Sequence, residues 1–374
     1  MVSLTFLPLF INLISSKQLF LTFSLPCPMI WDTYCRTLHK TSNENPMKTN
    51  NRELQKRFVS DYKLPIPLIN EEYFQYYLKL YESDYGALTK YNDLLENISV
   101  NYGNDPARFL EEYYDIRENI IQSVLSSPAF LKFNNMDMNV YAIKDRPNVT
   151  SNNIYNQNNA GKFFISVDIK KANFQTLKNI DKEIVLGADT YEDFIGKFTD
   201  SDYIKASKYT REVIFGKLNP KRHITAEKYF INKIYQDIIS QHPELKDKTV
   251  SLATDEMVFL ENPNTYQNPG NAVSLQEDIK RIAKENGFDV HVEFFFLQGY
   301  NLVFKESRSV RKTFYHKDFV LGDSNFKLIA APLPYHAMIY KLFKGLPLEE
   351  IDYHFDYESM DAKFCEEFDI ESLQ

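Results

Sequence analysis

Two short stretches of the sequence place carboxylates where apolar strands end. The stretch "FFISVDIKKANF" at residues 163–174 contains Asp168, and "TVSLATDEMVFLEN" at residues 249–262 contains Asp255 and Glu256. A strand that only packs into a core has no use for a carboxylate at its tip. Carboxylate oxygens bind Mg²⁺ and Mn²⁺, and a pair of such ions can promote phosphoryl transfer. These three residues are therefore candidate catalytic and metal-binding residues. The alternative is a turn cap followed by a solvated hairpin tip.

The elements that hold these carboxylates are predicted to be β-strands. Side chains alternate between the faces of a strand, so Asp255 shares a face with Ser251 and Ala253. Neighbouring strands lie about 4.8 Å apart, so Asp168 and Asp255 can converge if their strands pair or nearly pair. Glu256 can join them only if the chain turns or bulges, because a regular strand points it to the opposite face.

A group of cations lies between the two carboxylate stretches. Residues 207–230, "SKYTREVIFGKLNPKRHITAEKYF", contain Lys208, Arg211, Lys217, Lys221, Arg222 and Lys228 around a turn at Gly216, Asn219 and Pro220. Arg binds phosphate through two parallel hydrogen bonds, whereas Lys acts as a point charge. The segment predicts either a surface for a triphosphate or a solvated helical face. His223 is interpreted as a surface or structural histidine.

Residues directly after Asp168 can border a bound nucleotide. Lys170 and Lys171 add positive charge there, and the edge of Phe174 can test the 2′-position of a sugar, although a core phenylalanine is the alternative. Further along, the stretch "ESRSVRKTFYHKD" predicts a basic hairpin that can follow a nucleic-acid backbone. Its cations are Arg308, Arg311, Lys312 and Lys317.

This combination resembles a known architecture. An Asp that closes one strand, followed after a helical insert by an acidic pair in a hairpin, is similar to motifs A and C of palm-domain polymerases and nucleotidyltransferases. The elements "SVDIKKANF" and "SLATDEMVF" also resemble those of tRNA-His guanylyltransferase-like enzymes, over about residues 160–310. The resemblance implies that Asp168, Asp255, Glu256 and the carbonyl of Ile169 bind two Mg²⁺ or Mn²⁺ ions. It also implies nucleotidyl transfer from a nucleoside triphosphate to a DNA or RNA end. A two-metal nuclease and a non-catalytic palm that binds nucleic acid or protein remain alternatives.

Hydrophobic periodicity predicts an α+β fold whose order of elements resembles a ferredoxin-like βαββαβ palm. Strands are predicted at 163–169, 249–254, 257–261, 289–297, 301–305 and 326–330, and helices near 191–215, 225–246, 274–286 and 335–344. The predicted order begins with a leader or artefactual extension (1–46), a helical N-terminal domain (47–147) and an Asn-rich linker (148–162). A palm-like catalytic domain (163–334) follows, with a helical insert at 190–247. A C-terminal helix with an acidic tail (335–374) comes last.

Composition limits the possible functions of this chain. A net charge of −8 over 374 residues argues against a surface that coats nucleic acid, but it allows a local basic groove. Three scattered cysteines favour a reducing, intracellular compartment, in the cytoplasm or nucleus. The apolar run at residues 2–14 is short for a bilayer span, so no stable membrane insertion is expected. The acidic C-terminal tail predicts packing against the palm or a contact with a protein partner.

Overall fold

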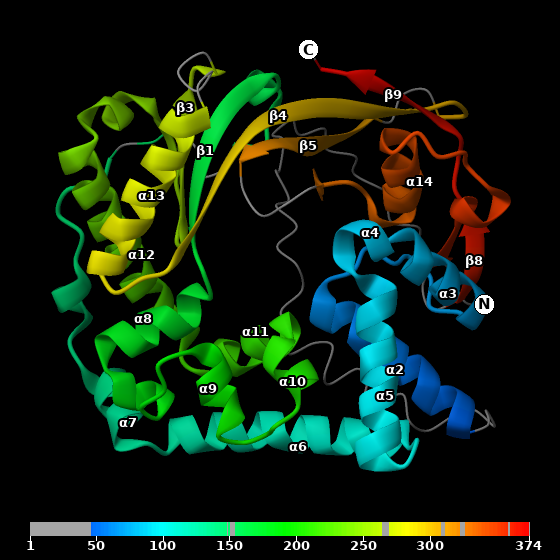
Figure 1. Cartoon of the computed structure of the whole chain (residues 1–374), viewed down its shortest axis with the longest axis horizontal. Helices are drawn as coiled ribbons and strands as arrows, with labels where there is room; N and C mark the ends of the chain where they lie inside the picture. The colour runs from blue at the N-terminus through cyan, green and yellow to red at the C-terminus, as the bar shows by residue number, and fades with distance from the viewer. Residues whose placement is uncertain are drawn as a thin grey trace, which may run out of the picture. The chain divides into compact units, whose positions relative to one another are not determined.

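Seven antiparallel strands form the sheet that carries the predicted carboxylates (Figure 1). They are β1 (Lys162–Ile169), β2 (Thr249–Leu252), β3 (Glu256–Glu261), β4 (Val290–Phe304), β5 (Arg311–Leu321), β6 (Lys327–Ile329) and β9 (Phe368–Ser372). The strand order is β2-β3-β1-β4-β5-β6, and β9 pairs with β4. A separate small sheet pairs β7 (His354–Tyr357) with β8 (Met360–Phe364). The chain is thus α+β, as the sequence predicts.

The computed structural model describes residues 46–147, 149, 154–263, 269–307, 311–321, 326–357 and 360–373. Contacts divide the chain between Glu44 and Asn45, so all of these residues belong to one unit. The predicted leader lies outside the described residues except for Pro46. Within the part that is described, no helix is both long and apolar enough to cross a membrane.

Helices make up most of the remaining structure. Before the sheet lie α2 (Pro46–Tyr62), α3 (Glu71–Leu80), α4 (Glu82–Tyr85), α5 (Ala87–Tyr102), α6 (Pro106–Leu125) and α7 (Pro128–Asn135). Between β1 and β2 lie α8 (Ala172–Ile180), α9 (Tyr191–Gly196), α10 (Asp202–Ala206), α11 (Lys208–Lys217) and α12 (Pro220–Gln241), and later α13 (Pro269–Glu285) and α14 (Leu333–Phe343). Short 3-10 turns occur at Met138–Tyr141, Gln157–Asn159, Lys182–Val185, Pro243–Lys248 and Glu350–Tyr353.

The two faces of the sheet have different surroundings. Ile165 and Val167 on one face pack against α12 and α13, in a core that includes Ile234 and Ile279. Phe164 on the other face packs with residues of β3, β4 and β5 and with Ile154 from the preceding segment. Alternation along β1 puts Ser166 and Asp168 on the face of Phe164, away from α12 and α13.

Two elements differ from their predicted form for local reasons. The helix predicted at 191–215 is three helices, because the side chains of Ser201 and Ser207 cap the starts of α10 and α11. The two strands predicted around Gly299 are one strand, β4. A Cβ atom at Gly299 would lie 2.9 Å from atoms of both Ala160 and Leu373, so glycine permits a close approach there and does not break the strand.

The N-terminal helices share their core with later parts of the chain. One buried cluster contains Phe58 and Phe109 from this region, Phe174 and Phe194 from the helices after β1, and Tyr340 from α14. Residues 47–147 therefore do not enclose a separate core. The segment predicted as an acidic tail contributes β7, β8 and β9.

Candidate active site

The end of β1 lies beside the turn between β2 and β3, and this brings the predicted carboxylates together. β1 pairs with β3 so that Asp168 is opposite Glu256. Directly opposite residues of an antiparallel pair share a face, so both side chains lie on the face away from α12 and α13. Asp255 lies in the turn, and its carbonyl oxygen accepts a hydrogen bond from the N–H of Ile169 at 2.9 Å. The strand that carries Asp168 thus holds the tip of the hairpin directly.

Arg146 fixes the other side of this turn. Its guanidinium donates to the carbonyl oxygens of Leu252 at 2.6 Å and Ala253 at 3.2 Å. The N–H of Ala253 donates to the carbonyl oxygen of Glu256 at 2.8 Å and closes the hairpin. The backbone around Asp255 is therefore held by β1, by Arg146 and by its own turn.

Burial and neighbouring negative charge raise the cost of ionising Asp168 and Asp255. Burial, followed by the charges of Asp255 and Glu256, raises the pKa of Asp168 to about 7, whereas Lys327 opposes the shift. Burial and Glu256 likewise raise the pKa of Asp255, against the effect of Lys208. Solvent still reaches the Asp168 side chain, which is exposed. The site therefore combines access for a ligand with an excess of negative charge.

The sequence analysis missed a row of ionisable side chains on the same sheet face. His291 on β4 lies opposite Asp168, and Glu293 follows two residues later. The carboxylate of Glu293 accepts from Lys317 of β5 at 3.0 Å, and the Lys317 side chain is only 2% exposed. Nearer to Asp168, the Ser166 hydroxyl donates to Glu256 at 2.6 Å. The signal for this row was the polar alternation of "VHVEFFF" inside an otherwise apolar strand.

A further carboxylate approaches from the helices. Glu227 on α12 is 8% exposed, and burial followed by the charge of Asp255 raises its pKa to about 7. The Glu227 carboxylate lies 3.6 Å from the ring of His223. Burial lowers the pKa of His223 to about 4, and its Nε2–H donates to the carbonyl oxygen of Asn173 at 2.8 Å. His223 is thus a neutral, structural residue.

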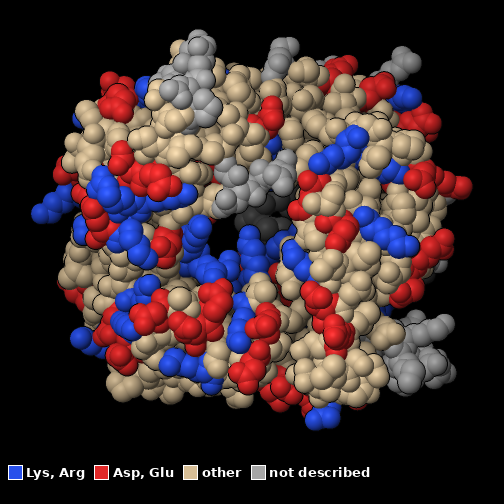
Figure 2. Space-filling model, in the orientation of Figure 1, with Lys and Arg blue, Asp and Glu red and all other residues tan. Residues whose placement is uncertain are grey.

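Three of the predicted nucleotide-binding cations lie near Tyr191 or Asp255. Lys171 and Arg211 lie over the ring of Tyr191, at 5.4 Å and 5.7 Å from its centroid. Lys171 also forms an ion pair with Glu192. Lys208 is the first residue of α11, and it lies close enough to Asp255 for its charge to oppose the rise in the pKa of that carboxyl group. Figure 2 shows a hollow just above α11 in this view, with Lys and Arg side chains on its wall.

Other residues predicted to bind the nucleotide or nucleic acid have structural roles or lie exposed at the surface. Arg222 donates to the carbonyl oxygen of Phe133 at 3.1 Å and to that of Met136, so it holds the end of α7. Phe174 is 2% exposed and packs among aromatic rings, which is the core role left open by the sequence. Lys170, Lys217 and Lys221 are exposed. The predicted basic hairpin included Lys317 and Arg308. Lys317 is buried against Glu293, and Arg308 lies outside the described residues.

The carboxylates suit a divalent cation by chemistry and charge. Their oxygens are the hard donors that Mg²⁺ and Mn²⁺ prefer, and a cation would relieve the repulsion that raises the pKa of Asp168. Among the residues that the structure describes, no group of three or more His, Cys, Asp or Glu side chains is arranged to hold a metal ion. Coordination by these side chains would therefore require them to rotate.

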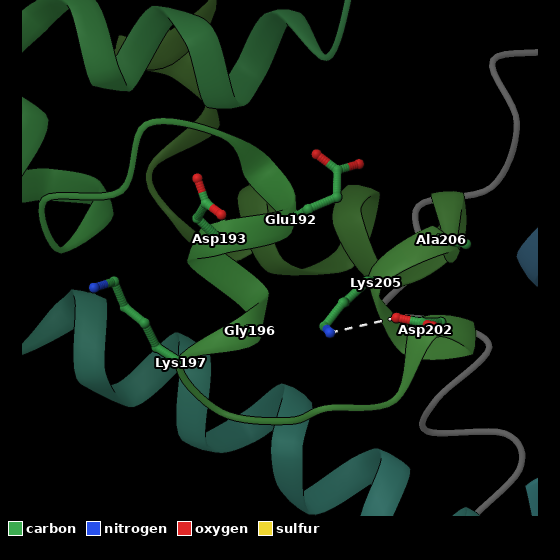
Figure 3. Close-up of a pocket in the computed structure, with 7 residues that line it drawn as sticks. All are labelled: Glu192, Asp193, Gly196, Lys197, Asp202, Lys205 and Ala206. Carbon is green, nitrogen blue, oxygen red and sulfur yellow. Dashed lines mark hydrogen bonds and ion pairs between the residues drawn. The ribbon is translucent and has the colours of Figure 1, made fainter.

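A cavity of about 550 Å³ lies between α9 and α10 (Figure 3). It is lined by Glu192, Asp193, Gly196, Lys197, Asp202, Lys205 and Ala206. Lys205 lies 3.4 Å from Asp202, and the lining includes none of the carboxylates at the ends of the strands. This cavity is thus separate from the candidate active site.

Comparison with known proteins does not place the chain in a family. No protein-family model matches it, and no curated protein and no solved structure does so either. Its function therefore has to be inferred from its own residues and geometry.

Proposed function

We propose that this chain is a metal-dependent nucleotidyltransferase that adds a nucleotide from a nucleoside triphosphate to the end of a nucleic acid. One observation carries the proposal: Asp168, Asp255 and Glu256 meet where β1 ends beside the β2–β3 turn. Asp168 and Glu256 lie on the sheet face opposite to the one that packs on α12 and α13. The strand order β2-β3-β1-β4, with helices between β1 and β2 and between β3 and β4, supports a ferredoxin-like, palm-like domain.

Each residue of the site has a role in this proposal. Asp168, Asp255 and Glu256 hold two Mg²⁺ or Mn²⁺ ions, which when bound supply positive charge to the reacting phosphates and the leaving pyrophosphate. Ser166 orients Glu256 through its hydrogen bond. Arg146 keeps the turn that presents Asp255 in place.

The neighbouring cations bear on the choice of substrate. Lys208 lies near Asp255, and Arg211 follows it on α11, so both can attract the triphosphate through charge-assisted hydrogen bonds. A two-metal nuclease could use the same carboxylates but would need no cluster of cations for a triphosphate. These cations therefore favour nucleotidyl transfer over nuclease activity.

An extension assay tests the proposal. The full chain is incubated with end-labelled primer–template DNA or RNA, Mn²⁺, and each NTP or dNTP. We expect extension by the parent protein and none by Asp168→Asn, whereas Asp202→Asn should retain activity because its side chain is 98% exposed and lies outside the site. Shortened primers would instead identify a nuclease, and unchanged primers a non-catalytic binding protein.

A binding variant adds a second readout to this assay. Arg211→Ala should raise the KM for the triphosphate roughly ten- to hundredfold, since a charge-assisted hydrogen bond contributes about 1.5–3 kcal/mol. Lys132→Ala, an exposed position on α7, is the control. An unchanged KM for Arg211→Ala would remove this residue from the triphosphate site.

A further inference from the structure

A second cavity, of about 400 Å³, lies where β1 leads into α8. Its walls come from α8, the segment that enters α9, α13 and the start of β4. Four lysines line it: Lys170, Lys171, Lys178 and Lys280. Its volume lies in the range of small-molecule sites. None of the carboxylates assigned to the active site is in its lining.

The carboxylates in this wall are already neutralised. Asp189, Glu192 and Asp289 line the cavity, and each has a lysine of its own. The pairs are Lys171–Glu192, Lys182–Asp189 at 2.8 Å and Lys284–Asp289 at 3.0 Å. Lys182 and Lys284 make their pairs from positions outside the lining. Three lining lysines, Lys170, Lys178 and Lys280, are in excess over the acidic groups.

The backbone that presents these lysines is fixed in place. The Gln175 side chain donates to the carbonyl oxygen of Asp289 at 2.9 Å and accepts from its N–H at 2.7 Å. The N–H of Lys170 donates to the same carbonyl oxygen at 3.0 Å. Lys178 donates to the carbonyl oxygen of Asp189 at 3.1 Å and lies over the buried ring of Phe174. The cavity therefore has a preformed floor and wall.

The cavity between α9 and α10 has no such excess of cations. Three carboxylates line it against two lysines, and Figure 3 shows these side chains around the opening. Glu192 contributes to both cavities, yet only in the one beside β1 do cations exceed acids. An anionic ligand would thus be favoured in the cavity beside β1 over its neighbour.

We propose that the 400 Å³ cavity binds the phosphate groups of a small ligand of the nucleotide or polyphosphate class. Lys170 and Lys280 contact the phosphates, and Lys178 adds positive charge from the α8 side. A compact, strongly charged anion matches three excess cations better than a carboxylate does. This site is distinct from the carboxylates of the proposed function and does not depend on their chemistry.

Calorimetric titration of the full chain with sodium tripolyphosphate tests the site. EDTA is present throughout, so that no metal ion can bridge the titrant to the carboxylates, and failure here leaves the extension assay unaffected. We expect saturable binding by the parent and at least tenfold weaker binding by Lys170→Ala/Lys280→Ala. The matched control is Lys162→Ala/Lys246→Ala, which removes the same charge from two exposed lysines at the opposite end of β1 and before β2. Its affinity should stay within twofold of the parent.

The outcomes of this titration are distinct. The proposal would be overturned if the parent did not bind tripolyphosphate. It would also be overturned if both double variants bound it equally weakly, because that result describes general attraction to a basic surface. Titration with ATP in the same buffer separates the two ligand classes. ATP binding at least as tightly as tripolyphosphate supports a nucleotide, and tighter tripolyphosphate binding supports a polyphosphate.

Discussion

Asp168 and Glu227 are carboxyl groups that the fold holds partly protonated near neutral pH. Both have a pKa raised to about 7, first by burial and then by the charge of Asp255. They approach Asp255 from different elements, β1 and α12. Such a concentration of buried carboxylates destabilises the fold unless protons or cations neutralise it. Stability measurements can therefore report on the site independently of catalysis.

We expect neutralisation of a site carboxylate to leave the metal-free protein as stable as the parent or more stable. At pH 8 with EDTA, Asp168→Asn and Asp255→Asn each remove a charge that its neighbours repel. Saturating Mn²⁺ should stabilise the parent by about 2.7 kcal/mol at 100 times the dissociation constant, but should stabilise neither variant. Thermal melts with EDTA and with Mn²⁺ measure both effects. A turn cap would behave in the opposite way, because its loss costs about 0.5–2 kcal/mol with or without metal.

Glu227 gives a prediction about pH. Its folded pKa is raised above the unfolded value, so its contribution to stability is full below about pH 4.5 and is lost as pH rises through about 7. Glu227→Gln should therefore be more stable than the parent at pH 8, by on the order of 1–3 kcal/mol, and should lose this advantage by pH 5. Urea unfolding in EDTA at both pH values measures the difference. The control is Glu277→Gln, an exposed change on α13, which should show no such dependence. If Glu227→Gln differed from the parent in stability by the same amount at both pH values, the prediction would be contradicted.

Individual residues differ in how far sequence reveals their role. The proximity of Asp168 and Asp255 was predictable, because a carboxylate after an apolar strand is a local signal. The role of Arg222 was not, because its partners are carbonyl groups of Phe133 and Met136, far away in the sequence. Glu293 lies in an apolar strand, and only the pairing of β4 with β5 shows its contact with Lys317.

At the scale of elements, apolar runs predicted the strands at the site better than they predicted their neighbours. The predicted strand at 163–169 agrees with β1 to one residue, because a buried strand is a continuous apolar run. β9 was missed, because "FDIES" is acidic and short, and its position depends on pairing with β4. The hairpin of β2 and β3 was predicted, but the side chain that holds it, Arg146, comes from a distant segment.

Arg146→Ala should loosen the hairpin that presents Asp255. The variant leaves the carbonyl oxygens of Leu252 and Ala253 without their charged donor, at a cost of about 1.5–3 kcal/mol. Hydrogen exchange should become faster at the N–H groups of Ala253 and Ile169, whose bonds join the turn to itself and to β1. Lys144→Ala, an exposed change two residues away, should leave exchange unaltered. Equal exchange in the two variants would show that Arg146 does not support the turn.

At the scale of the whole described unit, the C-terminal segment connects to the N-terminal helices through buried polar contacts. Lys341 on α14 is 2% exposed, and its ammonium lies 2.8 Å from the carboxylate of Asp352, which is fully buried. Tyr76 on α3 donates to Asp352 at 2.7 Å and accepts from Lys341 at 2.8 Å. Residues far apart in sequence thus form one charged cluster. Hydrophobic periodicity cannot reveal such a connection, because it records no partners.

Asp352→Ala should strongly destabilise the protein. It leaves the ammonium of Lys341 buried with no partner of equal burial, and breaking a buried pair in this way costs about 3–5 kcal/mol. The double change Lys341→Met/Asp352→Leu should recover much of the loss, since no uncompensated charge remains. Glu350→Ala, an exposed neighbour, should stay within about 0.5 kcal/mol of the parent. Urea unfolding followed by circular dichroism and by tyrosine fluorescence gives these values. The two signals should coincide if the unit unfolds as one.

The pairing of β9 with β4 has a consequence for how the chain is made. β1 occupies the first half of one edge of β4, and β9 occupies the rest, from Tyr300 to Phe304. A ribosome releases residues 300–304 long before residues 368–372, so the edge of β4 at residues 300–304 is unpaired in the nascent polypeptide. A bare strand edge is a template for pairing with other chains. Biosynthesis therefore includes an interval of vulnerability to aggregation, in which a chaperone has a surface to shield, and docking of β9 ends it.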